Sequence, residues 1–241
     1  MDYINSRLTA VYDSLNPASE YDRFYRDLAG TLPKTILDMG CGTGRMACDL
    51  AALGHHVTGA DPAVAMLAIA RERPGGDKVH WVKSDAGGLS LATRFDLIMM
   101  TGHAFQNVLT DEKVRAALRA FARHLKPQGM LAFETRNPAR REWEKWIPDL
   151  SRETVTLSDG SKVDVHNDIR STAGDLVTYE THVSFGPDDK VVGADTLRFM
   201  SAVELAQHLN EAGLTRQTWY GNWDRSPVGP ESPELIVVCQ L

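Results

Sequence analysis

The sequence predicts an α/β protein in which a doubly wound, mostly parallel sheet carries an antiparallel β insertion. Short apolar runs alternate with helix-like segments from Thr35 to about Pro138, and a glycine-rich loop, "GCGTG", follows the first run. From about Ser151 to Met200 the pattern changes to β-rich segments separated by turn sequences. Alternating strands and helices are typical of a parallel sheet covered on both faces. The ligand of such a sheet lies beyond the carboxyl ends of its strands.

The composition places limits on the function. The 241 residues suit one domain with an insertion or two small domains. The net charge of −6 argues against broad nucleic-acid binding, which uses a basic face. No segment reaches the roughly 20 apolar residues of a membrane helix. The three cysteines form no paired framework, as is typical of a reducing compartment. We therefore expect a cytoplasmic protein without a nucleic-acid or membrane partner.

The first half of the chain alternates strands and helices. Residues 18–30 predict a helix, because Tyr21, Phe24 and Leu28 recur at helical spacing before Pro33. The apolar runs that follow predict strands at 34–40, 55–62, 79–86, 95–102 and 130–138. The segments between them predict helices at 44–54, 63–73 and 111–129. The last of these helices has an acidic start and a basic end before Gly129, which suits the helix dipole.

The second half predicts an antiparallel meander followed by a return to the core. Hairpin turns are expected at Asp159-Gly160, Ala173-Gly174 and 186–190. A helix is expected at 201–214, with Ser201 as its N-cap and Glu204 in the reciprocal position of a capping box. The last two strands are expected at 215–221 and 234–241.

The sequence of the glycine loop indicates which kind of nucleotide it can bind. It has no Walker A pattern, which requires Gly-Lys-Ser/Thr. It also departs from the dinucleotide pattern G-x-G-x-x-G, because Gly44 comes one residue early after Gly40 and Gly42. Asp38, two residues before Gly40, would repel a pyrophosphate and attract a cation. The loop therefore predicts a ligand with a positive or donor group and little phosphate.

Two further acids follow the next two strands. Asp61 comes 21 positions after Gly40, near the spacing at which a carboxylate accepts hydrogen bonds from ribose hydroxyls. Asp85 ends the third strand, where it can accept the amine of an adenine. A ligand with an ammonium group, a ribose and an amine-bearing base matches these acids, and S-adenosylmethionine has all three groups.

The residues that carry this pattern also resemble a known family. Residues 36–71, "ILDMGCGTGRMACDLAALGHHVTGADPAVAMLAIAR", resemble the first motif of class I S-adenosylmethionine-dependent methyltransferases. The resemblance is strong from about Thr31 to Pro138 and extends more loosely to the small-molecule branch, such as sugar-nucleotide N-methyltransferases. It implies a Rossmann-like methyltransferase fold with a seven-stranded sheet.

The resemblance also implies a division of the chain into four parts. Residues 1–30 are expected to form an N-terminal helical lid and residues 31–150 the cofactor-binding core. Residues 151–200 are expected to form the β cap. Residues 201–241 are expected to supply a helix and two strands that complete the core sheet.

The resemblance assigns each candidate residue to one part of the cofactor. The methionine part, including its ammonium, is expected to lie against Asp38, Gly40, Gly42 and Gly44. The adenosine part is expected to lie against Asp61, Pro62, Met66, Asp85 and Ala86. The segment from Thr101 to His103 is expected beside the sulfonium, and Tyr12 or Tyr21 above the cofactor as a lid.

The sequence says less about which residues contact the methyl acceptor. His103 falls where the acceptor meets the methyl group, as a general base, a hydrogen-bond partner or a structural residue. Arg136 and Asn137 follow the fifth strand and either bind an acidic substrate or brace the insertion. His55 and His56 alternate faces in a strand, so we expect no metal site there.

The sequence as a whole predicts a methyltransferase that acts on a small-molecule N, O or C acceptor. Two alternatives stay open at this point: a non-catalytic module that binds S-adenosylmethionine or S-adenosylhomocysteine, and an NAD-type oxidoreductase. The expected oligomeric state is a monomer or a homodimer.

Overall fold

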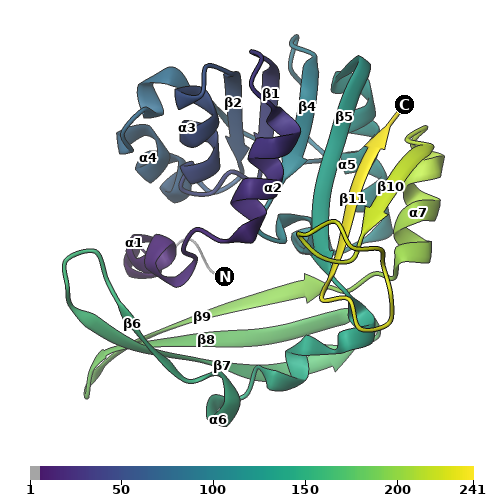
Figure 1. Cartoon of the computed structure of the whole chain (residues 1–241). Helices are drawn as coiled ribbons and strands as arrows, with labels where there is room; N and C mark the ends of the chain where they lie inside the picture. Colours follow the sequence, from purple (N-terminus) through teal and green to yellow (C-terminus); the bar gives the residue numbers. More distant parts are fainter. Residues whose placement is uncertain (1–5) are drawn as a thin grey trace.

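A seven-stranded sheet forms the centre of the upper part of the molecule in Figure 1, a computed structural model that describes residues 6–241. Its strands lie in the order β10-β11-β5-β4-β1-β2-β3. Their bounds are β1 (Thr35–Met39), β2 (His56–Asp61), β3 (His80–Lys83), β4 (Phe95–Met100), β5 (Leu125–Arg136), β10 (Arg216–Tyr220) and β11 (Glu234–Gln240). Strands β1 to β5 are parallel to one another, whereas β11 runs antiparallel to β5 and β10. The predicted fold class is confirmed.

Helices cover both faces of this sheet (Figure 1). They are α2 (Glu20–Ala29), α3 (Arg45–Ala52), α4 (Val64–Glu72), α5 (Asp111–His124) and α7 (Ala202–Glu211). Two further helices, α1 (Ser6–Leu15) and α6 (Pro148–Ser151), lie next to the second sheet described below. Short 3-10 turns lie at η1 (Gly76–Lys78), η2 (Ala104–Asn107), η3 (Pro138–Arg140) and η4 (Glu142–Lys145). In residues 6–241 there is no helix of the length and apolar character that crossing a bilayer requires.

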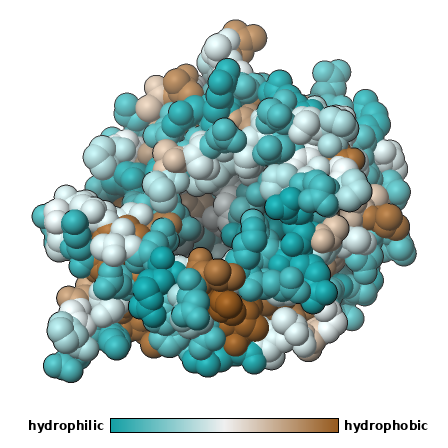
Figure 2. All heavy atoms as spheres, turned by 60° about the horizontal axis from the view of Figure 1, so that its bottom comes forward, coloured by the Kyte–Doolittle hydropathy of each residue, from teal (hydrophilic) through white to brown (hydrophobic). Residues whose placement is uncertain are grey.

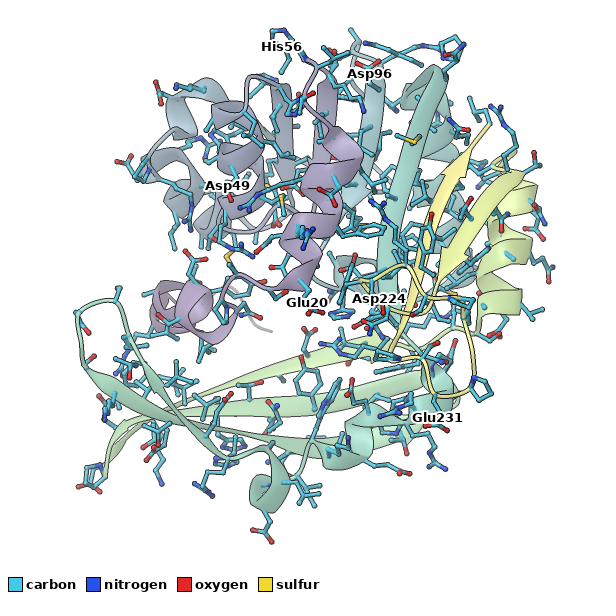
Figure 3. The ribbon with its side chains drawn as sticks, in the orientation of Figure 1. Glu20, Asp49, His56, Asp96, Asp224 and Glu231 are labelled. Carbon is cyan, nitrogen blue, oxygen red and sulfur yellow. The ribbon has the colours of Figure 1, made fainter. Side chains whose placement is uncertain are left out.

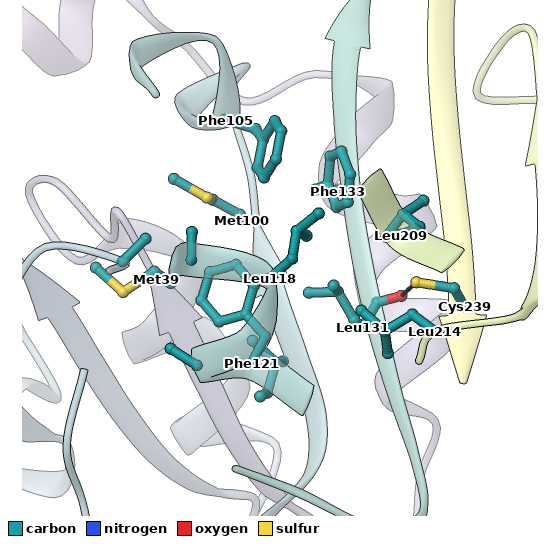
Figure 4. Packing of buried hydrophobic residues seen from close by; sticks show 14 of the residues in the cluster. Met39, Met100, Phe105, Leu118, Phe121, Leu131, Phe133, Leu209, Leu214 and Cys239 are labelled. Carbon is teal, nitrogen blue, oxygen red and sulfur yellow. Dashed lines mark hydrogen bonds between the residues drawn. The ribbon is translucent and has the colours of Figure 1, made fainter. Parts of the chain in front are cut away.

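The larger core cluster lies between the sheet and helices α5 and α7 (Figure 4). Phe105 and Phe133 stack there with ring centroids 4.1 Å apart. Leu118 and Phe121 come from the apolar face of α5, as its helical periodicity predicts. Because Phe105 belongs to η2, this packing fixes the loop that follows β4.

Helix α5 ends earlier than the sequence pattern predicts. The expected helix at 111–129 stops at His124, and the backbone is extended from Leu125, the first residue of β5. Pro127 explains the difference, because a proline disfavours helical backbone at the preceding residue and has no N–H of its own to donate. The strand predicted at 130–138 therefore begins five residues earlier.

A second, four-stranded antiparallel sheet lies below the core in Figure 1. Its strands are β6 (Glu153–Thr156), β7 (Lys162–Ala173), β8 (Leu176–Gly186) and β9 (Asp189–Arg198), paired in chain order. The three predicted hairpin turns connect them. The predicted capping box of Ser201 and Glu204 is also present, at the start of α7.

Helix α1 lies between the core and this second sheet (Figure 1). Leu8 packs among Val163, Val165 and Val183 of the second sheet. Arg7 forms an ion pair with Asp189, with Nη1 2.6 Å from Oδ1. The helix thus connects the glycine-loop end of the core to the insertion. Figure 2 turns this lower side toward the viewer and shows a mostly hydrophilic surface that is hollowed near its middle.

Candidate active site

Strands β1 and β4 are neighbours in the sheet, and the order in which strands are added reverses between them: β2 and β3 lie on one side, and β5 lies on the other. The glycine loop follows β1 and the segment Thr101–His103 follows β4, so both lie at this switch point. Gly40 has φ +74°, and a Cβ there would stand 2.9 Å from the Cβ of Ala104. A glycine is therefore required where the two loops meet.

A cavity of about 310 Å3 opens at the switch point; we call it the first cavity. It collects predicted cofactor residues from five separate segments of the chain. They are Tyr12, Gly40, Gly42, Asp61, Pro62, Met66, Asp85, Ala86 and Thr101. Asp38 and Gly44 are not in its wall. The family resemblance, together with the spacing of the acids and glycines, therefore named most of the residues that the fold brings together here.

Asp38 lies at the end of β1 with its side chain buried. The residue is 1% exposed, and neither carboxylate oxygen has a hydrogen-bond partner in the described part of the chain. Burial, strengthened by the negative charge of Asp61, raises the pKa of Asp38 to about 7. A buried, unsatisfied carboxylate is costly unless a cationic or donor group meets it. The geometry therefore favours a ligand with an ammonium group beside Asp38.

Asp61 lies at the end of β2, next to β1. Its Oδ2 accepts a hydrogen bond from the N–H of Gly42 at 2.9 Å, and its Oδ1 accepts one from Ala63 at 2.8 Å. Burial raises the pKa of Asp61, and the two backbone hydrogen bonds oppose that rise. The carboxylate thus holds the glycine loop in place while it lines the first cavity.

Asp85 has a more open position beyond β3. The residue is exposed, and its Oδ1 accepts a hydrogen bond from the N–H of Gly88 at 2.6 Å. Its neighbour Ala86 is buried. The two residues line the first cavity on the β3 side of the sheet.

A second cavity of about 350 Å3 adjoins the first. The two share wall residues, namely Tyr12, Gly40, Gly42, Thr101 and Gly102. The second cavity adds side chains that can act on a substrate, namely Tyr21, His103, Arg136 and Glu234. A group bound across the shared wall would therefore reach both cavities.

His103 is held at three points in the second cavity. Its backbone has φ +60°, which a residue other than glycine rarely adopts. Its N–H donates to Oε1 of Glu134 at 2.8 Å. Its ring Nε2 lies 2.9 Å from Oε2 and 3.1 Å from Oε1 of Glu234. Strained backbone with this many contacts is typical of functional sites.

His103 and Glu234 share one titratable proton at neutral pH. Burial raises the pKa of Glu234 to about 8. Burial, with a smaller contribution from Arg136, lowers the pKa of His103 to about 3. Between these values the pair binds a single proton along the contact of Nε2 with Oε2. Glu234 therefore becomes a free carboxylate only in mildly alkaline solution.

Glu134 was not among the sequence candidates. It is fully buried in β5 and accepts hydrogen bonds from the Tyr25 hydroxyl and from the backbone N–H of His103. Burial raises its pKa. An acid inside the otherwise apolar strand "MLAFET" is the signal that could have revealed it, because acids are rarely buried without a role.

Two predicted cofactor residues have structural contacts outside the first cavity. Gly44 lines neither cavity, and a Cβ there would stand 2.4 Å from the ring of Trp81. Tyr21 lines the second cavity, where its hydroxyl accepts a hydrogen bond from Arg45. Arg45 is in turn paired with Asp22 at 2.7 Å.

Helix α1 is tied to the glycine loop beside Tyr12, which lines both cavities. The hydroxyl of Thr43 donates to Asp13 at 2.5 Å, and Arg73 forms an ion pair with the same carboxylate. Tyr12 thus stands over the loop on a helix that the loop itself anchors.

Charged residues also lie where the parallel strands begin, at the end of the sheet away from the cavities, and have structural roles there. His56 and Asp96 are labelled at that end in Figure 3, far from the cavities. Asp96 accepts a hydrogen bond from the N–H of Thr35 at 2.8 Å and forms an ion pair with Lys126 at 2.7 Å. Across residues 6–241 there is no group of three or more His, Cys, Asp or Glu side chains placed to hold a metal ion.

Comparison with known proteins identifies the family. A family profile described as a methyltransferase domain matches residues 36–129. The cypemycin N-terminal methyltransferase of Streptomyces sp is 33% identical over 207 residues, which cover 86% of this chain and 83% of the relative. A putative methyltransferase of Geobacillus sp. (strain WCH70) is 30% identical over 218 residues, 85% of this chain and 86% of that protein. This chain belongs to the methyltransferase family.

Solved structures agree with this assignment at the level of the fold. The CcbJ methyltransferase from Streptomyces caelestis has a TM-score of 0.78 at 23% identity, with 97% of this chain and 95% of that chain covered. CalS10 from Micromonospora echinaspora, an amino pentose methyltransferase solved with S-adenosylmethionine bound, has a TM-score of 0.70 at 23% identity, with 96% and 95% covered. The predicted S-adenosylmethionine-dependent methyltransferase is confirmed, and the matches do not fit an NAD-type oxidoreductase.

Proposed function

We propose that this methyltransferase transfers a methyl group from S-adenosylmethionine to an amine nitrogen of a small molecule. The observation that carries the proposal is the shared wall of the two cavities. On one side of this wall lie the acids that match the cofactor. On the other side lie His103 and Glu234, which can bind an amine and take its proton.

The cofactor fits the first cavity through its polar groups. Asp38, which is buried outside the cavity wall and has no partner in the described chain, would hold the ammonium of the methionine part, directly or through water. Asp61 would accept the ribose hydroxyls, and Asp85 with Ala86 would meet the adenine. Pro62 and Met66 supply apolar walls for the adenosine. Gly44 would act indirectly, by allowing the loop to pack against Trp81.

S-adenosylmethionine supplies a methyl group on a positively charged sulfur, already activated for transfer. The amine lone pair attacks the methyl carbon, a C–N bond forms, and the C–S bond breaks with its electron pair left on sulfur. The products are S-adenosylhomocysteine and a methylated ammonium. The chain's own contribution is to align the reactants and exclude water, which can supply several kcal/mol of the barrier reduction, on the order of 7–11 in well-oriented cases.

The proton of the acceptor is assigned to Glu234. An amine enters as an ammonium ion at neutral pH and must lose a proton before its lone pair can attack. A carboxylate whose pKa is raised to about 8 is well matched to that proton. His103, whose own pKa is lowered, would position Glu234 through the contact of 2.9 Å.

Two of the similar proteins support an amine acceptor. A cypemycin N-terminal methyltransferase and an amino pentose methyltransferase are named for amine-bearing molecules, whereas the ubiquinone biosynthesis O-methyltransferases are named for an oxygen acceptor. Within this chain, residues 1–30 would serve as a lid through Tyr12, and residues 151–200 as a cap below the second cavity.

The proposed setting is a reducing compartment, the cytoplasm. Cys41, Cys48 and Cys239 are all free thiols, and the net charge of −6 disfavours nucleic acid and anionic membranes as partners. A monomer or a homodimer remains the proposed assembly.

The test is an acceptor screen with the purified chain. It would be incubated with S-adenosylmethionine and matched sets of primary amines, phenols and carboxylic acids, and S-adenosylhomocysteine formation would be followed by mass spectrometry. We expect turnover with amines, and a large loss of that turnover in Glu234→Gln. Turnover confined to phenols or acids, or unchanged activity in the variant, would contradict the proposal.

A further inference from the structure

We propose that the acceptor carries an oxyanion, a carboxylate or a phosphate, which binds to Arg136 while its amine lies at Glu234. This inference rests on the proposed function, because it describes the occupant of the same second cavity. Arg136 and Glu234 both line that cavity and are directly opposite each other in the pairing of β5 with β11.

Arg136 is fixed in place before any ligand binds. Its Nη1 donates to Oε1 of Gln106 at 3.0 Å, and its guanidinium carbon lies 5.3 Å from the ring centroid of Trp146. Gln106 is fully buried and donates from Nε2 to the carbonyl of Arg198 at 3.1 Å. The arginine is therefore preorganised by a buried amide and an aromatic face, and little conformational entropy remains to be lost on binding.

The remaining donors of Arg136 have no partner among residues 6–241. Its Nε and Nη2 make no hydrogen bond in the described structure, and no described carboxylate lies within 4.0 Å of the guanidinium. The other arginine of the cavity wall, Arg45, is already bound to Asp22 and Tyr21. Arg136 is thus a half-buried cation whose free edge matches the two oxygens of a carboxylate or phosphate.

The neighbouring residue, Asn137, holds the adjacent loops in place. Its Nδ2 donates to the carbonyl of Ser232 at 2.9 Å, which holds the loop before β11. Its Oδ1 accepts from the N–H of Ala139 at 3.1 Å. Asn137 therefore has a structural role, whereas Arg136 combines structural contacts to Gln106 and Trp146 with a free edge, its Nε and Nη2, that is left for recognition.

The experiment measures anion binding to the protein both without ligand and loaded with S-adenosylhomocysteine. Inorganic phosphate and acetate are titrated separately by calorimetry at constant ionic strength, into wild type, Arg136→Gln and Arg136→Lys. Arg140→Gln is the matched control, because Arg140 is exposed and pairs with Glu231 at 3.0 Å, outside the cavity (Figure 3 labels Glu231).

We expect saturable binding of phosphate or acetate to wild type, and the tighter of the two identifies the acceptor's anion. Binding should weaken about tenfold or more in Arg136→Gln, the loss expected for a hydrogen bond to a charged group, and change less than about twofold in the control. Arg136→Lys keeps the charge without the two-pronged geometry, so a loss of a few-fold is expected, which keeps the test valid if the glutamine variant does not fold.

Three outcomes would overturn the inference. Neither anion binds wild type, or Arg136→Gln binds as tightly as wild type, or binding disappears once S-adenosylhomocysteine is present. In the last case Arg136 holds the cofactor's own carboxylate. Failure of S-adenosylhomocysteine to bind at all is recorded in a separate titration and would contradict the proposed function itself.

Discussion

Glu234 lies opposite Arg136 across the β5–β11 pair, yet its carboxylate contacts His103, 2.9 Å away, and not the arginine. Burial raises the pKa of Glu234 to about 8 although the charge of Arg136 opposes that rise, so the carboxyl group is protonated and uncharged below that value. The cavity thus contains a proton acceptor and, within the described chain, an unpaired cation side by side. This relationship underlies both the proposed reaction and the proposed acceptor.

Glu234→Gln should remove the alkaline rise of activity. With a pKa of about 8, the carboxyl group is protonated below that value and cannot accept a proton, so wild-type kcat/KM for an amine should increase toward pH 8 and then level off. The variant should be at least about a hundredfold slower, as expected for loss of a general base, and should lack the inflection near pH 8, so that any remaining rise follows the ionisation of the amine itself. A pH profile of the same shape in both proteins would remove Glu234 from the mechanism.

His103→Gln should separate cofactor binding from turnover. His103 contacts Glu234 and is not in the wall of the first cavity, so affinity for S-adenosylhomocysteine should change little while kcat falls. Calorimetry on the variant and initial rates with an amine acceptor measure the two quantities. Full activity in the variant would show that Glu234 needs no positioning by this ring.

Asp38→Asn should stabilise the free protein and weaken cofactor binding. The pKa of Asp38 is raised to about 7, above its value in an unfolded chain, so wild-type stability should fall as pH rises from about 4 to 7. The variant has no carboxyl group to ionise at this position, so it should keep this stability and melt at a higher temperature than wild type at pH 8. Its affinity for S-adenosylmethionine should drop about tenfold or more.

The same residue should make wild-type affinity depend on pH. An ammonium beside Asp38 favours the ionised carboxylate, so binding should tighten between pH 5 and 7 with release of a proton. Calorimetry in buffers of different ionisation enthalpy counts that proton. Equal proton release by wild type and Asp38→Asn would argue that the ammonium lies elsewhere.

Asp61→Ala should weaken S-adenosylmethionine binding by about tenfold or more, because a hydrogen bond to a charged group is worth roughly 1.5–3 kcal/mol. The carboxylate also accepts hydrogen bonds from Gly42 and Ala63, so the glycine loop should loosen. Asp61→Asn is the matched variant that retains an acceptor. Unchanged affinity in folded Asp61→Ala, measured by calorimetry, would contradict the ribose assignment.

Gly44→Ala should destabilise the fold through the ring of Trp81. A Cβ at position 44 would stand 2.4 Å from that ring and adopt φ +76°. Gly54→Ala is the control, since Gly54 has φ +92° but no atom lies within 4 Å of the place that its Cβ would take. The control should lose about 1 kcal/mol from backbone strain alone, and Gly44→Ala about 1–3 kcal/mol more. Equal losses of unfolding free energy in the two variants, measured by denaturant titration, would show that the loop and Trp81 move apart at little cost.

The fold and the cofactor side were predictable from local sequence. Strand ends carry Asp38, Asp61 and Asp85 in a parallel sheet, and parallel strands bring their carboxyl ends to one edge. Most of the predicted cofactor residues line one cavity for that reason. Gly44 matched the same pattern, but its close neighbour Trp81 belongs to β3, and no local signal shows such a packing contact.

The acceptor side was harder to predict because it depends on pairing between distant segments. Glu234 reaches His103 only because β11 pairs with β5 in one register, across about a hundred residues of chain. Glu134 lies in the interior of a strand, where the period of two sets its face but not its partner. Burial, which raises the pKa values of both acids, is a property of the tertiary structure.

The most direct test of the central claim is a thermal melt of wild type with S-adenosylmethionine, S-adenosylhomocysteine, NAD and NADP, each in large excess. A ligand at 100 times its dissociation constant should add about 2.7 kcal/mol to the stability of the folded state. We expect stabilisation by the two adenosyl-sulfur compounds alone, and a stabilisation reduced to about half or less in Asp38→Asn, as a tenfold weaker affinity implies. Stabilisation by NAD alone, or an equal shift in the variant, would contradict the account.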